Sequence, residues 1–288
     1  MTDGFLLVDK ESGFTSHDVV ALARKKMGTK KIGHAGTLDP MATGLLVLGV
    51  GIGTKLLSFI VDGAKSYEAT IRLGASTSTD DKDGEIIEIF EIDQISDDEI
   101  LKTLETFKGK IAQRPSSVSA IKIGGKRAHE LVRAGVEVDI PEREVEIFRL
   151  DALGIKRAEK FIDIDVNVRC SSGTYIRSIA RDLGVKLGNG GHLTKLNRSE
   201  VAPFSLSEAK LLAESKLISI KIGIERILPT RVLEVSEAKE IFFGRPIEKS
   251  ESELTAAFLA NGDFAALLTN KSEGDKVLAF PSLVNVKE

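Results

Sequence analysis

Tryptophan is absent from the 288-residue chain, and cysteine, tyrosine and proline occur only once, twice and seven times. A single cysteine excludes both a disulfide within the chain and a zinc site built from cysteines. Cys170 ends a run of alternating apolar residues, so we interpret it as a core residue rather than a catalytic thiol. Few aromatic side chains are available as platforms on which a nucleic-acid base could stack.

Long apolar runs are also missing. The longest stretches, such as residues 44–52, fall far short of the roughly 20 residues that a membrane-spanning helix needs. The N-terminal sequence lacks the basic opening and the small-residue cleavage site of a signal peptide. We therefore expect a cytoplasmic protein without a membrane association.

Charge of one sign is not in excess over the whole chain, because 40 Lys and Arg residues face 43 Asp and Glu residues, giving a net charge of −3. This balance excludes a uniformly basic nucleic-acid-binding surface. The charge is nevertheless segregated along the chain: residues 80–107 carry −9, residues 108–135 carry +6 and residues 166–200 carry +4. Such basic segments are either solvated faces or contacts for phosphates, so any polyanion would be held by a local patch.

Alternating and helical patterns are interspersed along the chain. Alternation predicts strands at 67–73 and 162–170, and apolar runs predict strands at 5–8 and 45–50. Helices are predicted after Ser16 as N-cap, over 95–107 and over 176–187. The pattern favours an α+β fold with a mixed sheet. Pro229 marks a plausible boundary, with a small β domain beyond it.

The most informative segment is a loop at residues 30–44, which contains three glycines, two threonines and one proline between Gly33 and Gly44. It lacks the spacings of nucleotide phosphate loops. Asp39 is the only acidic residue between Asp18 and Asp62. An isolated Asp-Pro is most often a turn, but here an imidazole, hydroxyls and two lysines surround a single carboxylate. Arg177, a cation in the first turn of a predicted helix, indicates an anionic partner nearby.

The loop GHAGTLDPMATGLL resembles the signature of the TruB family of pseudouridine synthases. The resemblance extends over roughly residues 4–204, through FLLVDK, SYEATIRLG, RPSSVSAIKIGGKRAHELVRAG and CSSGTYIRSIARDLG. It implies a pseudouridine synthase fold with a central mixed, mainly antiparallel sheet flanked by helices. It further implies a catalytic domain at 1–228, an insertion at about 108–135 that closes over RNA, and a PUA-like RNA-binding domain at 229–288.

The resemblance also implies an activity, the conversion of uridine 55 in the tRNA T-loop to pseudouridine. Asp39 matches the catalytic aspartate, Arg177 the arginine that pairs with it and Tyr67 the tyrosine that stacks on the target base. His34 matches the histidine that replaces the flipped base, while Tyr175 and Leu196 match residues of the uridine pocket. The basic residues expected to contact RNA are Lys10, Lys30, Lys31, Lys122, Lys126 and Arg127.

Because the reaction exchanges an N1–C1′ bond for a C5–C1′ bond without oxidation or reduction, we expect neither a cofactor nor a metal. An ionised carboxylate can act as a nucleophile or stabilise positive charge on the sugar, and an arginine would keep it charged. Without the resemblance, Arg177 could be a structural ion-pair partner or a phosphate contact, and Tyr67 an ordinary core residue.

The sequence is compatible with three hypotheses for the function of the chain. The chain is a monomeric tRNA uridine isomerase that needs no protein partner, a tRNA-binding folding factor without essential catalysis, or an RNA-guided synthase. The Asp39 loop with Tyr67 and Arg177 favours the first. The basic 108–135 segment and the β tail motivate the second, and the absence of an obvious protein-partner extension weakens the third.

Overall fold

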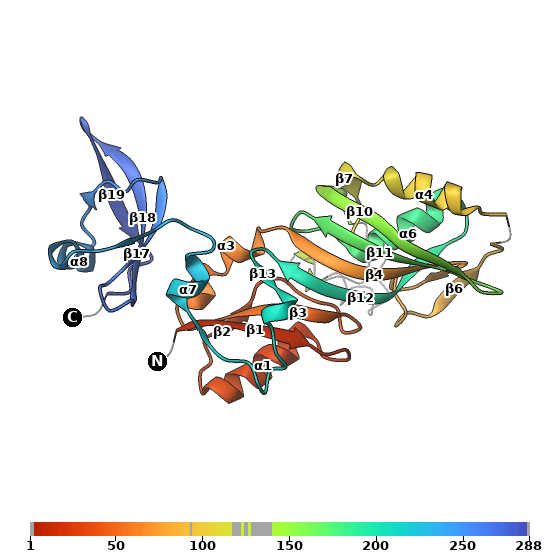
Figure 1. Ribbon diagram of the computed structural model, residues 1–288, viewed down its shortest axis with the longest axis horizontal. Coiled ribbons are helices and arrows are strands. Elements are labelled where there is room, and N and C mark those ends of the chain that lie inside the picture. Colours follow the sequence, from red (N-terminus) through yellow and green to blue (C-terminus); the bar gives the residue numbers. More distant parts are fainter. Residues whose placement is uncertain (1–2, 93, 117–121, 124–125, 128–139, 287–288) are drawn as a thin grey trace.

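The computed structural model describes residues 3–92, 94–116, 122–123, 126–127 and 140–286. Within them, ten strands form one sheet in the order β14-β1-β3-β12-β4-β11-β10-β7, with β13 paired to β12 and β2 to β3 (Figure 1). The strands span Gly4–Lys10 (β1), Ile32–His34 (β2), Thr43–Val50 (β3), Lys65–Leu73 (β4), Gly109–Gln113 (β7), Arg143–Arg157 (β10), Ile162–Cys170 (β11), Gly191–Val201 (β12), Phe204–Ser205 (β13) and Ile218–Ser219 (β14).

All pairs in this sheet are antiparallel except one. β12 runs parallel to β3, where Asn197 lies opposite Thr43 and Arg198 opposite Gly44. The expected mixed, mainly antiparallel sheet is therefore confirmed. β3 begins four residues after Asp39, and β12 carries Leu196 and Arg198. The register between these two strands therefore fixes where the Asp39 loop lies relative to Leu196 and Arg198.

Helices cover one face of the sheet. α1 (Ser16–Met27), α4 (Asp97–Glu105) and α6 (Ile176–Leu187) contribute buried residues to a single apolar cluster with β1, β3, β4, β11 and β12. Cys170 lies in this cluster, 1% exposed, and burial raises the pKa of its thiol to about 11. The interpretation of Cys170 as a core residue is therefore confirmed.

The N-cap of α1 differs from the prediction. Thr15, not Ser16, caps the helix, in a capping box with Asp18. Ser16 lies in the first turn, and its buried hydroxyl both donates to the Leu38 carbonyl (3.2 Å) and accepts from the Leu38 amide (2.8 Å). A side chain predicted to cap a helix therefore fastens the Asp39 loop to that helix.

A smaller sheet follows, in the order β15-β17-β18-β19-β16, and packs with α8 (Val235–Phe242) around its own buried cluster (Figure 1). Its strands span Thr230–Val232 (β15), Ile247–Glu248 (β16), Leu254–Phe258 (β17), Phe264–Glu273 (β18) and Lys276–Ser282 (β19). Phe258 and Phe264 also join the apolar cluster beneath β1 and β3, so the two sheets share buried contacts. The predicted small β unit at the C-terminus is confirmed as part of the fold.

The remaining short elements connect these layers. Three short helices pack on the apolar cluster beneath β1 and β3: α2 (Gly53–Leu56), α3 (Ser58–Val61) and α7 (Ile220–Ile224). A 3-10 turn spans Leu206–Glu208. Two hairpins pair β5 (Ala75–Thr77) with β6 (Ile86–Ile89) and β8 (Lys122–Ile123) with β9 (Lys126–Arg127). No helix among the described residues is long and apolar enough to cross a membrane.

Gly44 marks the point where the loop enters β3 against β12. Its φ is +100°, and a Cβ added there would lie 2.4 Å from the Arg198 carbonyl oxygen. We therefore expect Gly44→Ala to lower the free energy of unfolding by roughly 3 kcal/mol in a urea titration, from backbone strain and a backbone clash together. Gly13→Ala is the control, since Gly13 has φ +89° but nothing within 4 Å. Equal losses in both variants would show that the clash with β12 is unimportant.

Candidate active site

Two buried cationic side chains hold the Asp39 loop by donating hydrogen bonds to its backbone carbonyls. Arg198 is 1% exposed, and its guanidinium donates to the carbonyls of Leu45 (2.8 Å), Thr37 (3.3 Å) and Gly36 (3.2 Å). Lys10, also 1% exposed, donates to the carbonyls of Glu11, Phe14 and Pro40. Two buried cations thus bind the loop on both sides of Asp39 and fix the direction of its side chain.

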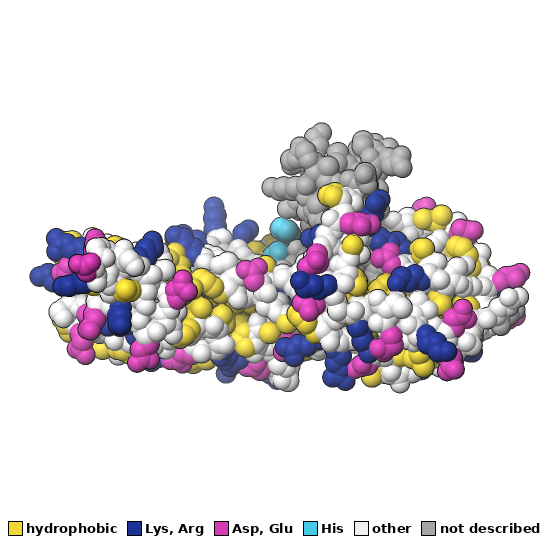
Figure 2. Space-filling model, turned by 90° about the horizontal axis from the view of Figure 1, so that it is seen from above, with side chains coloured by type: hydrophobic (Ala, Val, Ile, Leu, Met, Phe, Trp, Pro, Cys, Tyr) yellow, Lys and Arg dark blue, Asp and Glu magenta, His cyan; other side chains and the backbone are white. Residues whose placement is uncertain are grey.

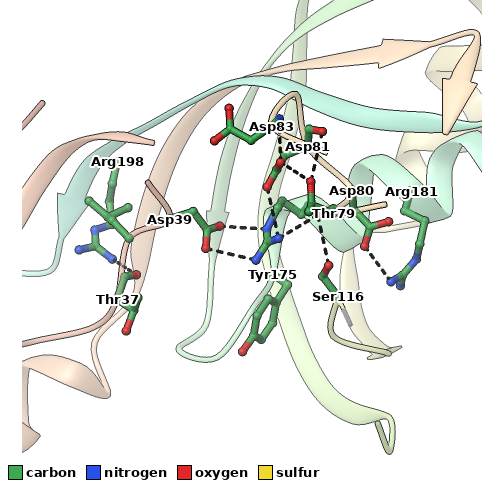
Figure 3. Close-up of polar contacts among 12 residues, drawn as sticks. Thr37, Asp39, Thr79, Asp80, Asp81, Asp83, Ser116, Tyr175, Arg181 and Arg198 are labelled. Carbon is green, nitrogen blue, oxygen red and sulfur yellow. Dashed lines mark hydrogen bonds and ion pairs between the residues drawn. The ribbon is translucent and has the colours of Figure 1, made fainter. Parts of the chain in front are cut away.

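Asp39 forms a two-point ion pair with Arg177 of α6. Arg177 Nε lies 2.9 Å from Asp39 Oδ2, and Nη2 donates to Oδ1 at 3.2 Å (Figure 3). The arginine side chain is 4% exposed and the aspartate 30%. Because Arg177 approaches from within the protein, the carboxylate keeps an open side from which a substrate can reach it. The anionic partner expected for a cation in the first turn of this helix is therefore found.

A second carboxylate, from a residue the sequence did not single out, lies on the other side of Arg177. Nη1 of Arg177 lies 3.3 Å from Oδ2 of Asp81 and donates to the Thr79 carbonyl at 2.8 Å. Asp81 itself is 4% exposed and is held by the Thr79 hydroxyl and the Asp83 amide. Asp39 contacts Nε and Nη2 of the guanidinium, while Asp81 and Thr79 contact Nη1 (Figure 3). These contacts together limit its rotation relative to Asp39.

Burial raises the pKa of the Asp39 carboxyl. The positive charge of Arg177 opposes this rise, and the negative charge of Asp81 adds to it. A desolvated carboxylate that is nonetheless held by an arginine is more reactive than one in water, since water does not stabilise its charge. The arrangement suits a nucleophile or an electrostatic stabiliser of a sugar cation.

Tyr67 lies on β4 opposite Arg198 and is 8% exposed. Burial raises the pKa of its hydroxyl, and the neighbouring positive charge of Arg198 opposes this rise. Tyr67 is therefore paired across the sheet with the arginine that holds the Asp39 loop through the carbonyls of Thr37 and Gly36. A phenol with a raised pKa stays protonated at neutral pH, so it is poorly suited to remove a proton without help from a neighbour.

The other predicted pocket residues flank this centre. Leu196, 5% exposed on β12, packs in the same cluster as Tyr67. Tyr175 precedes α6 and is half-buried, with the Arg143 guanidinium 4.6 Å from its ring. His34 is the last residue of β2, five residues before Asp39, and is also half-buried, with its ring centroid 5.6 Å from that of His17. Burial, and after it the neighbouring charges of His17 and Arg198, lower the pKa of His34, which favours the neutral imidazole.

The predicted RNA-contacting residues differ in their accessibility. Lys30 and Lys31 are exposed beside the loop, as a phosphate contact requires. Lys10 is not, because its ammonium is buried against three carbonyls; burial lowers its pKa to about 8. A role for Lys10 in binding RNA does not fit this geometry, and its contacts are those of a loop brace. Lys122, Lys126 and Arg127 lie on β8 and β9, with side chains outside the described residues, as is much of the predicted insertion.

Charges are mixed on the molecular surface. On the face shown in Figure 2, Lys and Arg side chains are interspersed with Asp and Glu side chains, and the visible histidine side chains lie together. Among the residues that the structure describes, no group of three His, Cys, Asp or Glu side chains could hold a metal ion.

Known proteins resemble this chain in sequence over most of its length. Residues 24–176 match the N-terminal domain of TruB family pseudouridylate synthases. A tRNA pseudouridine synthase B of Corynebacterium diphtheriae is 53% identical over 250 residues, covering 84% of this chain and 83% of that protein. One of Paenarthrobacter aurescens is 45% identical over 297 residues, covering 97% and 96%.

The fold is also seen in solved structures. A chain of a Cbf5-Nop10-Gar1 complex superimposes with a TM-score of 0.69 at 22% identity, covering 99% of this chain and 84% of that one. This likeness confirms the expected pseudouridine synthase fold. With the family match over more than half of its length and relatives of 45–53% identity, the chain belongs to the TruB family of pseudouridylate synthases.

Proposed function

We propose that this protein converts uridine 55 in the T-loop of tRNA to pseudouridine, with Asp39 as the catalytic residue. The observation that carries the proposal is the two-point Asp39–Arg177 ion pair, in which a buried arginine fixes a partly exposed carboxylate. Relatives of 45–53% identity named tRNA pseudouridine synthase B support tRNA as the substrate.

The reaction requires three things of the site. The target base must leave its stack, the N1–C1′ bond must break, and the C5–C1′ bond must form with transfer of the C5 proton away and of a proton to N1. Asp39, ionised and partly desolvated, attacks the sugar or the base, or stabilises the sugar cation as the bond breaks. Arg177 keeps it charged and in place. No oxidation or reduction takes place, so the residues of the chain suffice for the bond exchange.

The surrounding residues bind the extruded nucleotide. Tyr67 presents its ring to the uracil, with a stacking contribution of about 1–3 kcal/mol. Leu196 and Tyr175 line the uridine pocket, and neutral His34 fills the gap that the base leaves in the T-loop stack. We also propose that residues 1–228 act as the catalytic domain and residues 229–288 as an RNA-binding domain. The chain then works as a monomer without a protein partner.

The test of this function uses the purified chain with no added protein or RNA. It is incubated with unmodified tRNA and with an isolated T-stem-loop hairpin, each also prepared with cytidine in place of the target uridine. Mass spectrometry of the digested RNA should find pseudouridine at position 55 in both uridine substrates and at no position in the cytidine controls. Conversion at another position, or only after a guide RNA is added, would contradict the proposal. RNA binding without any conversion would instead favour the folding-factor hypothesis.

Lys30 and Lys31 supply the exposed positive charge beside the loop. We expect Lys30→Ser/Lys31→Ser to weaken tRNA binding and to lower the slope of log K against log salt by about 1–2, because each lost phosphate contact releases fewer counterions. Binding measured by fluorescence anisotropy over a salt series gives this slope. Lys102→Ser/Lys160→Ser, which removes two exposed lysines elsewhere, is the control. An equal change of slope in both variants would contradict a local contact at the loop.

A further inference from the structure

Arg181 lies one helical turn beyond Arg177, on the same face of α6. Its Nη1 is 3.3 Å from Oδ2 of Asp80, and its Nη2 donates to the Arg114 carbonyl at 2.7 Å. Consecutive residues of one turn, Asp80 and Asp81, therefore bind successive arginines of one helix. The Asp81–Arg177 contact belongs to the catalytic centre, whereas the Asp80–Arg181 contact does not touch Asp39.

The turn that carries Asp80 has an unusual backbone. Asp80 is one of two non-glycine residues with positive φ among those described, at φ +59°. Its amide donates to the Thr77 carbonyl (3.3 Å), and its carbonyl accepts from the Leu193 amide of β12 (3.0 Å). A non-glycine residue in this region is strained unless its surroundings hold it there. The side chain of Asp80, 15% exposed, supplies such a hold through Arg181.

Ser116 joins the same turn from another element. It is fully buried after β7, and its hydroxyl donates to the Thr79 carbonyl (3.3 Å), one residue before Asp80. The Thr79 carbonyl also accepts from Arg177. Three residues before Ser116, the Gln113 side chain makes two hydrogen bonds with the Tyr175 backbone at the start of α6 (3.0 and 2.8 Å). These hydrogen bonds join the turn, the end of β7 and the start of α6; Figure 3 shows the contacts of Ser116 with Thr79 and of Asp80 with Arg181.

We propose that Asp80, Arg181 and Ser116 form a clasp that positions Arg177 for the reaction by holding the 79–81 turn against α6. The clasp does not contact the substrate. It fixes the Thr79 carbonyl and the Asp81 carboxylate, which contact Nη1 of Arg177, the guanidinium nitrogen that Asp39 does not use. If the turn moves away, Arg177 loses these two contacts, and its guanidinium is then free to rotate out of the two-point contact with Asp39. The proposal rests on the proposed function, because it assigns a positioning role in that same site.

A double-mutant cycle tests the clasp. Asp80→Asn removes the charge while keeping a residue that tolerates positive φ, and Arg181→Met removes the guanidinium while keeping an apolar stem of similar length. Single-turnover rate constants and RNA dissociation constants are measured for both variants, the double variant and Arg181→Lys. The control cycle uses Arg72→Met and Asp163→Asn, since this pair is also an arginine–aspartate ion pair (2.7 Å) but lies elsewhere, on β4 and β11.

Each single clasp variant should lower the rate constant about tenfold or more, because small displacements of a catalytic pair are costly, while RNA affinity stays within about twofold. The double variant should be no slower than the slower single one, since each single substitution already breaks the Asp80–Arg181 contact. Arg181→Lys, which keeps the charge, should recover part of the rate. The control variants should keep the wild-type rate constant within about twofold.

The outcomes separate this proposal from the function on which it rests. Clasp variants that fold and react at the wild-type rate, or whose rate losses simply multiply in the double variant, would overturn the clasp while leaving the function intact. A wild-type protein that forms no pseudouridine would overturn the function instead. Thermal melting of every variant identifies any that fail to fold, and the milder Arg181→Lys variant then decides between a structural and a positioning role.

Discussion

Replacing Asp39 by asparagine is expected to abolish uridine isomerisation, with a single-turnover rate constant at least about 10⁴-fold below that of the wild-type protein. Asparagine has nearly the same shape and can still accept a hydrogen bond from Arg177, but it cannot attack a carbon as a carboxylate or stabilise a sugar cation by charge. Release of tritium from RNA labelled at uridine C5 measures the rate. RNA affinity should stay within a few-fold, because the lost charge is not a phosphate contact.

The same substitution should not harm the fold. Burial raises the pKa of Asp39 above its ordinary value of 3.8, so the folded chain binds a proton there more tightly than the unfolded chain. The stability that the protonated carboxyl contributes is therefore present below pH 3.8 and is lost as pH rises through the folded-state pKa. At neutral pH the wild-type protein carries the cost of the desolvated charge. Asp39→Asn avoids it, so its melting temperature at pH 7 should equal or exceed that of the wild type. A marked fall would mean that the ion pair is chiefly structural.

Removing the guanidinium in Arg177→Met is expected to lower the rate constant by about 10³-fold and to destabilise the fold by about 3 kcal/mol or more. The loss of stability arises because Asp39 and Asp81 would face each other without the cation between them. Arg177 opposes the rise in the pKa of Asp39, so its removal moves that pKa further upward. The acid limb of the pH–rate profile, which reports the ionisation of Asp39, should therefore shift to higher pH in Arg177→Met.

Arg177→Lys is the matched control for this variant, since it restores a positive charge without the two-point geometry. It should return the acid limb toward the wild-type position while leaving most of the rate loss in place. If lysine restored the full rate, charge alone would account for the arginine and the two-point orientation would be irrelevant. If neither variant moved the acid limb, the limb would belong to a group other than Asp39.

Regular strands and capped helices could be predicted from the sequence, but the two long strands with register shifts, β10 and β12, could not. β4 and β11 alternate cleanly because they pair without interruption over nine residues. β12, at the centre of the sheet, has register shifts after Leu193 and after Arg198, and β10 has shifts after Ile147 and Ala152. Each bulge moves the following side chains to the other face, so the period of two is lost from the sequence.

Asp39 and Arg177 of the candidate site could be predicted from the sequence, whereas the roles of Asp81 and Lys10 could not. Asp39 stands out because no other acidic residue is near it in the chain, and Arg177 because it is a cation at the start of a helix. Asp81 lies in an acidic segment between Asp80 and Asp83, where local composition does not distinguish a buried carboxylate from exposed ones. Lys10 illustrates the opposite error, because a lysine beside a basic loop resembles a phosphate contact, whereas its three carbonyl partners are brought to it only by the tertiary fold.

The central claim is that Asp39 performs the isomerisation of uridine 55. Its most direct test is a nucleotide-resolved map of pseudouridine, by carbodiimide labelling and primer extension, on tRNA treated with an excess of wild-type or Asp39→Asn protein until the wild-type reaction is complete. We predict a full-strength stop at position 55 with the wild-type protein and none with Asp39→Asn, although both bind the tRNA. A stop of equal strength with Asp39→Asn would contradict the account.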